Sequence, residues 1–183
     1  MENRDVASNL EFFSGPMRAT QLSEAMKGIM NPTEKLIHPS KYKYLYRIGH
    51  STNENSAQKD RNFTSPWWLD WDAYNTVLRY QTNNSISLTL ASRVMNAQTT
   101  DHGVADRLIK VELLKPVLAF VGVGKMMKDS KGRSYAPSTS YSQMFIPGLG
   151  KINISSGKPM HEDCMHKHPV TEIAPGKINP TGW

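Results

Sequence analysis

Cysteine, long apolar runs and runs of a single charge are all scarce in this chain of 183 residues. The only cysteine, Cys164, excludes an intramolecular disulfide framework and a zinc site built from several cysteines. No window approaches the length of apolar sequence that a membrane-spanning helix needs, so no such helix is expected. No run of five basic residues concentrates the net charge of +6, which therefore favours anionic partners without identifying one.

The remaining composition is typical of one domain of ordinary size, with 38% apolar, 21% charged and 9% aromatic residues. The first residues, MENRDVASNLEFF, carry mixed charge and lack the apolar segment of a classical secretory signal. We therefore expect the protein to act in the cytoplasm, or to be delivered into a target cell by another machinery. A single cysteine suits such a reducing compartment.

Apolar periodicity predicts an α+β fold. Helical spacing predicts a helix over 16–30, and strict alternation predicts a strand over 41–49 that buries the face carrying Tyr42, Tyr44, Tyr46 and Ile48. The other predicted elements are a polar loop over 51–62, a helix from the Ser65 N-cap and Pro66 to residue 80, an ambiguous segment over 86–97, and strands over 105–114, 116–124 and 142–149.

This pattern divides the chain into a helical lead-in over 1–40, a core over 41–150 and an irregular tail over 151–183. The tail contains scattered turn-forming residues and no sustained apolar period. We therefore expect a chain that is truncated after Lys151 to remain folded.

Three separated segments are candidates for one site: LYRIGHS at 45–51, FTSPWW at 63–68 and SQMFIPGLG at 142–150. In these segments the sequence resembles the ADP-ribosyltransferase superfamily, particularly the mono-ADP-ribosylating bacterial toxins. That family has an arginine on a first strand, a Ser-Thr-Ser-like strand end, and a glutamate that opens a strand ending in Pro-Gly. The resemblance covers roughly residues 41–150 and implies a split β-sheet core with flanking helices.

The resemblance also implies a role for each matching residue. Arg47 corresponds to the family arginine, which pairs with phosphate or ribose oxygens of the substrate NAD. Thr64 and Ser65 match the last two places of the hydroxyl motif, and Phe63 replaces the first. Gln143 occupies the place of the catalytic glutamate. The expected catalytic residues are thus Gln143 and Ser65, and the expected NAD-binding residues are Arg47, Thr64, Trp67 and Trp68, whose indoles could stack on a ring of NAD.

Glutamine at position 143 departs from the family pattern. Its amide can bond a ribose hydroxyl, but it brings no negative charge to the cationic sugar that develops as nicotinamide leaves. Losing one such stabilising group commonly lowers the rate by about two to three orders of magnitude. Three explanations stay open: a divergent active enzyme, an inactive relative that only binds, and an engineered Glu-to-Gln variant.

Two functions follow as hypotheses. The first is an NAD-dependent ADP-ribosyltransferase toxin or effector, which modifies a macromolecular target or hydrolyses NAD; such a toxin implies an immunity protein in the producing cell. The second is a non-catalytic binding module that presents basic and aromatic side chains to nucleic acid or to an acidic protein.

A histidine-rich segment near the C-terminus offers possible metal ligands. His161, Cys164, His166 and His168 all lie within eight residues, and this crowding strains a closed tetrahedral site. We therefore expect a solvent-exposed tail and no metal.

Overall fold

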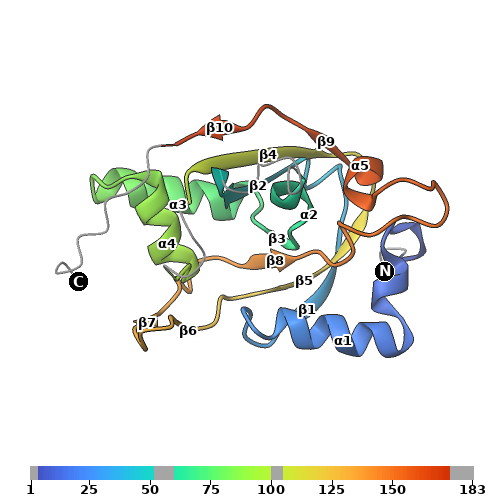
Figure 1. The fold of residues 1–183 in the computed structure, drawn as a ribbon, viewed down its shortest axis with the longest axis horizontal. Coiled ribbons are helices and arrows are strands. Elements are labelled where there is room, and N and C mark those ends of the chain that lie inside the picture. Colours follow the sequence, from blue (N-terminus) through green and yellow to red (C-terminus); the bar gives the residue numbers. More distant parts are fainter. Residues whose placement is uncertain (1–3, 52–59, 100–104, 174–183) are drawn as a thin grey trace.

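Residues 4–51, 60–99 and 105–173 are described by the computed structural model, which has the expected mixed α+β fold (Figure 1). The helical segments are the short 3-10 helices η1 (Arg4–Val6) and η2 (Leu10–Phe13), and the α-helices α1 (Gly15–Ala25), α2 (Arg61–Thr64), α3 (Trp71–Asn83), α4 (Leu88–Asn96) and α5 (Met160–Cys164). The strands are β1 (Thr33–Ile37), β2 (Tyr44–Gly49), β3 (Trp67–Trp68), β4 (Arg107–Leu113), β5 (Val117–Gly122), β6 (Met127–Lys128), β7 (Ser134–Tyr135), β8 (Gln143–Phe145), β9 (Met165–Lys167) and β10 (Thr171–Glu172). None of the helices in these ranges is long and apolar enough to span a membrane.

Two larger antiparallel sheets and one small hairpin organise the strands. The first sheet has the order β1-β5-β8-β3, the second has the order β10-β4-β2 with β9 also paired to β4, and β6 pairs with β7. The two larger sheets are joined where Tyr46 of β2 faces Leu69, the residue after β3. Each backbone N–H of this pair donates to the other residue's carbonyl at 2.8 Å. The strand that carries Arg47 thus lies beside the strand that follows Ser65.

Strand β2 is buried on both faces, which differs from the predicted one-sided burial. Leu45 is fully buried in the main core, whereas Tyr46 packs in a second apolar cluster beneath α3 and α4. Successive side chains of a strand point to opposite faces. Arg47 therefore shares the face of Leu45, and Tyr44 shares the face of Tyr46.

The predicted helix over 65–80 begins later than expected. Helix α3 starts at Trp71, where the Asp70 carboxylate accepts a hydrogen bond from the Ala73 backbone N–H at 2.8 Å. Trp67 and Trp68 instead form β3 and pair with Phe145 and Met144 of β8. Tertiary strand pairing outweighs the local N-cap signal at Ser65. The ambiguous segment over 86–97 is helical, as α4.

The lead-in over 1–40 contains a strand as well as helices. Strand β1 pairs with β5 along its whole length. Asn9 is fully buried between η1 and η2: its amide donates to the carbonyls of Leu118 and Pro147 and accepts from the Leu118 backbone N–H. These bonds attach the N-terminal segment to β5 and to the turn after β8.

The C-terminal segment is not the irregular tail that the sequence indicated, at least over residues 160–172. It contains α5, and both β9 and β10 pair with β4. Met160, Cys164 and Met165 belong to the main core. Short strands lack a periodic signature, so the pattern missed them. Residues 174–183 of the expected tail, and 52–59 of the expected loop, lie outside the described residues.

We predict that Met160→Ala lowers the free energy of unfolding by about 2–5 kcal/mol, because truncating a buried methionine leaves a cavity in the main core. The matched control is Met17→Ala on α1, where the side chain is exposed and the change should stay within about 0.5 kcal/mol. Chemical denaturation of the full chain measures both. Equal effects of the two substitutions would show that α5 does not contribute to the core.

Candidate functional site

Within the described residues, Arg47 is a cation without a carboxylate partner. Its Nη1 donates to the Asn62 carbonyl at 3.0 Å, and its guanidinium carbon lies 5.9 Å from the centre of the Trp68 ring. Its Nε is buried, and no hydrogen-bond partner for it exists among the described residues. Burial, reinforced by the positive charge of Arg61, lowers the pKa of Arg47 to about 10. The side chain remains charged at neutral pH, and the contacts that it makes with described residues are to a backbone carbonyl and an aromatic ring.

Helix α2 supplies the partner of Arg47 and is itself fastened to the end of β2. The Asn62 side chain is buried; its Oδ1 accepts from the His50 backbone N–H and its Nδ2 donates to the His50 carbonyl. A Cβ at Gly49 would lie 2.4 Å from Asn62 Oδ1, so this close approach requires glycine. The contacts hold α2 against the strand that carries Arg47.

The hydroxyl motif follows directly after α2. The Ser65 carbonyl accepts from Trp68 Nε1 at 2.8 Å, while its hydroxyl lies 3.5 Å from the Trp67 backbone nitrogen. Thr64 packs against Gly150, where a Cβ would lie 3.3 Å from the Thr64 Cβ. Ser65 is half-buried and close to Arg47 through the shared neighbour Trp68. The structure thus brings Arg47, Ser65 and Trp68 together.

The two tryptophans expected to bind NAD are packed within the protein. Trp68 is 1% exposed, so it supports Arg47 from within the core and presents no free ring face. Trp67 makes an edge contact with Phe145, with ring centres 5.0 Å apart, and its ring also covers Gly28. Within the described residues the exposed tryptophan is Trp71, at 53%.

Gln143 lies on the adjacent strand but on the other face. It opens β8, whose next residue, Met144, pairs with Trp68. Cross-strand partners share a face and neighbours along a strand alternate, so the Gln143 side chain leaves the face that carries Trp68 and Arg47. A Cβ at Gly124 would lie 2.7 Å from Gln143 Nε2 and 2.8 Å from Pro137 Cβ. The structure places the motif strands side by side without bringing Gln143 to Arg47.

Pro137 also lines a pocket of about 520 Å³ between α3, α4 and the segment before β8. This volume is within the range of small-molecule sites. Its lining combines polar and apolar side chains, among them Thr76, Arg79, Tyr80, Met95 and Ser138. Gln143 is therefore near a cavity that could admit a ligand.

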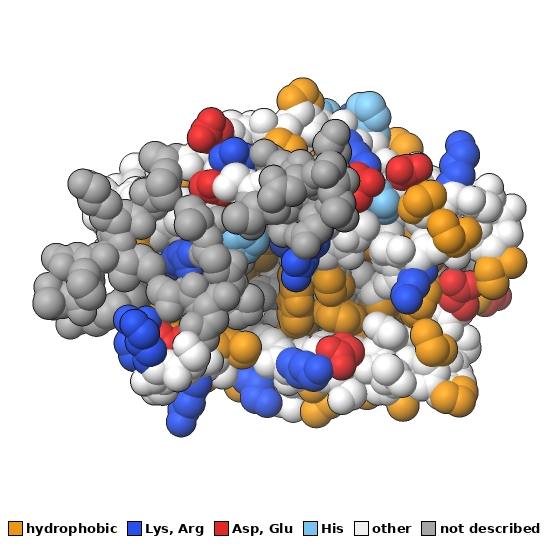
Figure 2. Space-filling model, viewed as in Figure 1, with side chains coloured by type: hydrophobic (Ala, Val, Ile, Leu, Met, Phe, Trp, Pro, Cys, Tyr) orange, Lys and Arg blue, Asp and Glu red, His pale blue; other side chains and the backbone are white. Residues whose placement is uncertain are grey.

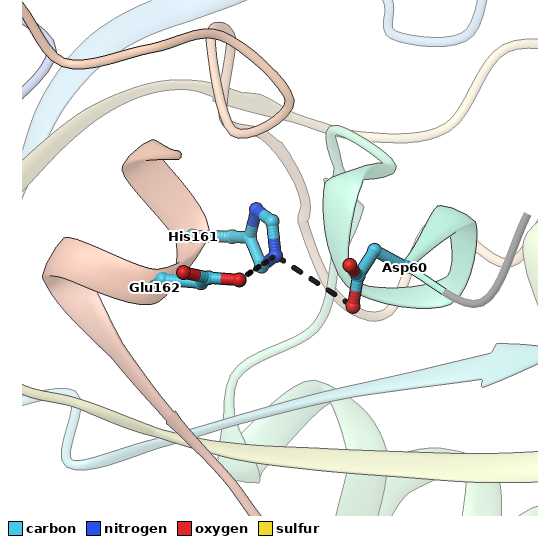
Figure 3. A group of neighbouring side chains, drawn as sticks. All are labelled: Asp60, His161 and Glu162. Atoms are coloured by element: carbon cyan, nitrogen blue, oxygen red, sulfur yellow. Dashed lines mark ion pairs between the residues drawn. The ribbon is translucent and has the colours of Figure 1, made fainter. Parts of the chain in front are cut away.

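The histidine-rich segment does not form one cluster. Cys164 is fully buried, and burial raises its pKa to about 12, which excludes a reactive thiolate at neutral pH. His166 is exposed and contacts the ring of His168. His161 is buried, and its ring faces Asp60 and Glu162 (Figure 3). Sequence reasoning missed this last grouping, because Asp60 lies far from His161 along the chain.

We predict that Arg47→Met leaves the free energy of unfolding unchanged or raises it by up to about 4 kcal/mol, since an apolar side chain replaces a buried, uncompensated charge. Inorganic pyrophosphate should raise the melting temperature of the unmodified protein and not that of Arg47→Met. Arg18→Met, at an exposed position of α1, is the control and should respond to pyrophosphate like the unmodified protein. A pyrophosphate response that survives Arg47→Met would place the anion elsewhere.

Comparison of the chain with models of protein families, with curated proteins and with solved structures found no match. The family resemblance therefore rests on the three sequence motifs, and the chemistry of the site rests on the contacts described above.

Proposed function

We propose that this protein is an NAD-dependent ADP-ribosyltransferase that acts as a toxin or effector on a macromolecular target. The observation that carries the proposal is the half-buried guanidinium of Arg47, whose Nε is buried without a hydrogen-bond partner and which has no carboxylate partner among the described residues. An uncompensated buried cation is costly, and an anionic ligand removes that cost. The pyrophosphate of NAD is such a ligand, and the planar guanidinium fork suits its oxygens.

The arrangement of the strands supports the same proposal. The three motif segments are far apart in sequence, yet β2 is bridged to the residue after β3, and β3 pairs with β8. This adjacency is what the family resemblance requires of a split sheet in which an arginine strand, a hydroxyl strand end and an acidic strand border one cleft. The adjacency of the three strands supports the proposal that the fold is the split sheet of that superfamily.

In the proposed reaction the glycosidic C–N bond of NAD breaks and nicotinamide leaves with the bonding electron pair. A nucleophile of the target, or water, then bonds to the ribose carbon and loses a proton. Arg47 holds the phosphates, while Thr64 and Ser65 brace the turn beside it. Gln143 would bond a ribose hydroxyl only after the backbone at the start of β8 changes conformation, because its side chain lies on the face opposite Arg47. Its neutral amide stabilises the cationic sugar less than a carboxylate would.

The proposal extends to compartment and partners. An NAD-consuming toxin acts where NAD is abundant, in the cytoplasm of the producing cell or of a cell into which it is delivered. The producing cell then needs an immunity protein that blocks the site. An acidic surface would suit that partner, because the chain carries a net charge of +6.

A second candidate function is a binding module without catalysis, and the placement of Gln143 favours it. The residue lacks charge and points away from the face of Arg47, which suits an inactive relative that retains only the anion site. On the face shown in Figure 2, however, Lys and Arg side chains surround a central group of hydrophobic side chains and do not merge into one basic patch. This distribution supports a small anionic ligand better than a long nucleic acid.

We predict that Gln143→Glu raises NAD turnover by about two orders of magnitude, because it adds a charge beside the developing cationic sugar. The measurement is nicotinamide release, with labelled transfer to a lysate as a second assay. Gln143→Ala should not show the gain, and adding Arg47→Met should abolish it. Gln21→Glu on α1 is the matched control for an added carboxylate.

The two functions give different outcomes in this experiment. If turnover is measurable and the same with Gln, Glu or Ala at position 143, that position is not catalytic. If NAD raises the melting temperature but none of the three proteins turns it over, the binding module is supported. If NAD neither binds nor is consumed by any of these variants, the proposed activity is wrong.

A further inference from the structure

A group of potential metal ligands joins α5 to the start of α2, away from Arg47. His161 is 3% exposed, and its Nδ1 lies 2.9 Å from the Leu149 carbonyl oxygen. A carbonyl can only accept, so Nδ1 carries the proton and donates it. With Nδ1 as the donor, Nε2 is the ring atom that is left to bind a metal ion through its lone pair. This arrangement, with a backbone carbonyl holding the distal ring nitrogen, is typical of histidines that bind metals.

Nε2 of His161 faces two carboxylates without a hydrogen bond to either. It lies 3.8 Å from Asp60 Oδ1 and 3.9 Å from Glu162 Oε1, and within the described parts of the chain it is a buried atom with no hydrogen-bond partner. Figure 3 shows the ring edge directed between the two acids. These distances are too long for hydrogen bonds. The Nε2 atom and the two carboxylates gather negative charge at one point, and Lys167 compensates it only at Asp60, so a cation between the three groups would be stabilised.

We propose that this charge is a divalent metal ion of the zinc class, bound by His161 Nε2, Asp60 and Glu162. The three ligand atoms lie within 4.8 Å of one another. Two atoms that bind one ion at about 2.0–2.2 Å lie about 3 to 4 Å apart, so movements of the two carboxylates alone would complete the geometry. One imidazole and two carboxylates favour zinc over magnesium or calcium, which prefer all-oxygen sites.

The exposure of the ligands suits this proposal. The side chains of Asp60 and Glu162 are 51% and 45% exposed, so the ion can enter from solvent and keep a water as its fourth ligand. The buried His161 supplies the rigid part of the site.

Lys167 is the built-in competitor for the metal. Its Nζ lies 2.6 Å from Asp60 Oδ1, the same oxygen that faces His161. In the metal-bound protein, Asp60 must use its other oxygen or release Lys167. Removing the Lys167 side chain should therefore strengthen zinc binding. If a proton on His161 took the place of the metal ion, removing Lys167 would not create a zinc site.

The experiment is isothermal titration of the full chain with zinc chloride, and a melting curve with and without zinc. We expect one zinc ion per chain and a higher melting temperature. Lys167→Gln should bind zinc more tightly, while Glu162→Gln and His161→Gln should bind it about tenfold more weakly or not at all. His166→Gln, an exposed histidine in the same segment, is the matched control, and magnesium chloride is the control for charge alone.

Because His161 is buried, the substitution His161→Gln could unfold the protein. In that case Glu162→Gln, at an exposed side chain, decides whether the site binds zinc. The proposal is overturned if neither the unmodified protein nor Lys167→Gln binds zinc, or if Glu162→Gln binds it as tightly as His166→Gln. These measurements contain no NAD, and Arg47→Met should bind zinc normally. Their result is therefore independent of the proposed enzymatic activity.

Discussion

Two backbone hydrogen bonds between Tyr46 and Leu69 connect the larger sheets, and the candidate site depends on them. They hold β2, which carries Arg47, beside the chain that leaves β3. Among the residues that the structure describes, no other backbone hydrogen bond joins a strand of the first sheet to a strand of the second. Tyr46 is further restrained by stacking on Tyr74 of α3, with ring centres 4.4 Å apart, so the second apolar cluster stabilises the junction.

The junction between the two sheets holds the charged Arg47 side chain in a partly desolvated position. The Asn62 carbonyl and the Trp68 ring both attract the guanidinium of Arg47, but neither carries a compensating negative charge. Removing a cation from water without a counter-ion costs free energy, which the surrounding core supplies. Retaining such a residue makes physical sense where a ligand brings the missing charge. Exposed ion pairs such as Lys27 with Glu24 differ from Arg47, because solvent screens their charges and they change the free energy of unfolding little.

The sequence was informative where the structure is locally determined. Alternation predicted β2, and runs rich in strand-forming residues predicted β4 and β5. The segments that carry Arg47, Ser65 and Gln143 are neighbours in the fold. It was uninformative where distant pairing decides. Trp67 and Trp68 follow Ser65, which the sequence predicts as a helix N-cap, yet they form a strand because they pair with β8. Residues 165–167 form a strand only because β4 offers a free edge. The side-chain face of Gln143 depends on the register with Trp68, which no local pattern contains.

Helix α2 connects the two sites that the structure suggests. Its preceding residue, Asp60, bonds Lys167 and faces His161, while Asn62 within the helix accepts the hydrogen bond from Arg47. Lys167 also lies over the Phe63 ring, 4.8 Å from its centre. The C-terminal segment therefore contacts α2 through Lys167, and α2 in turn contacts Arg47 through the Asn62 carbonyl. A helix of four residues is too short to be stable alone, so its position depends on these tertiary contacts. A substitution that weakens the contact between α5 and Asp60 should consequently shift α2 and change the position of Arg47. This holds although the Arg47 site and the His161 site share no residue.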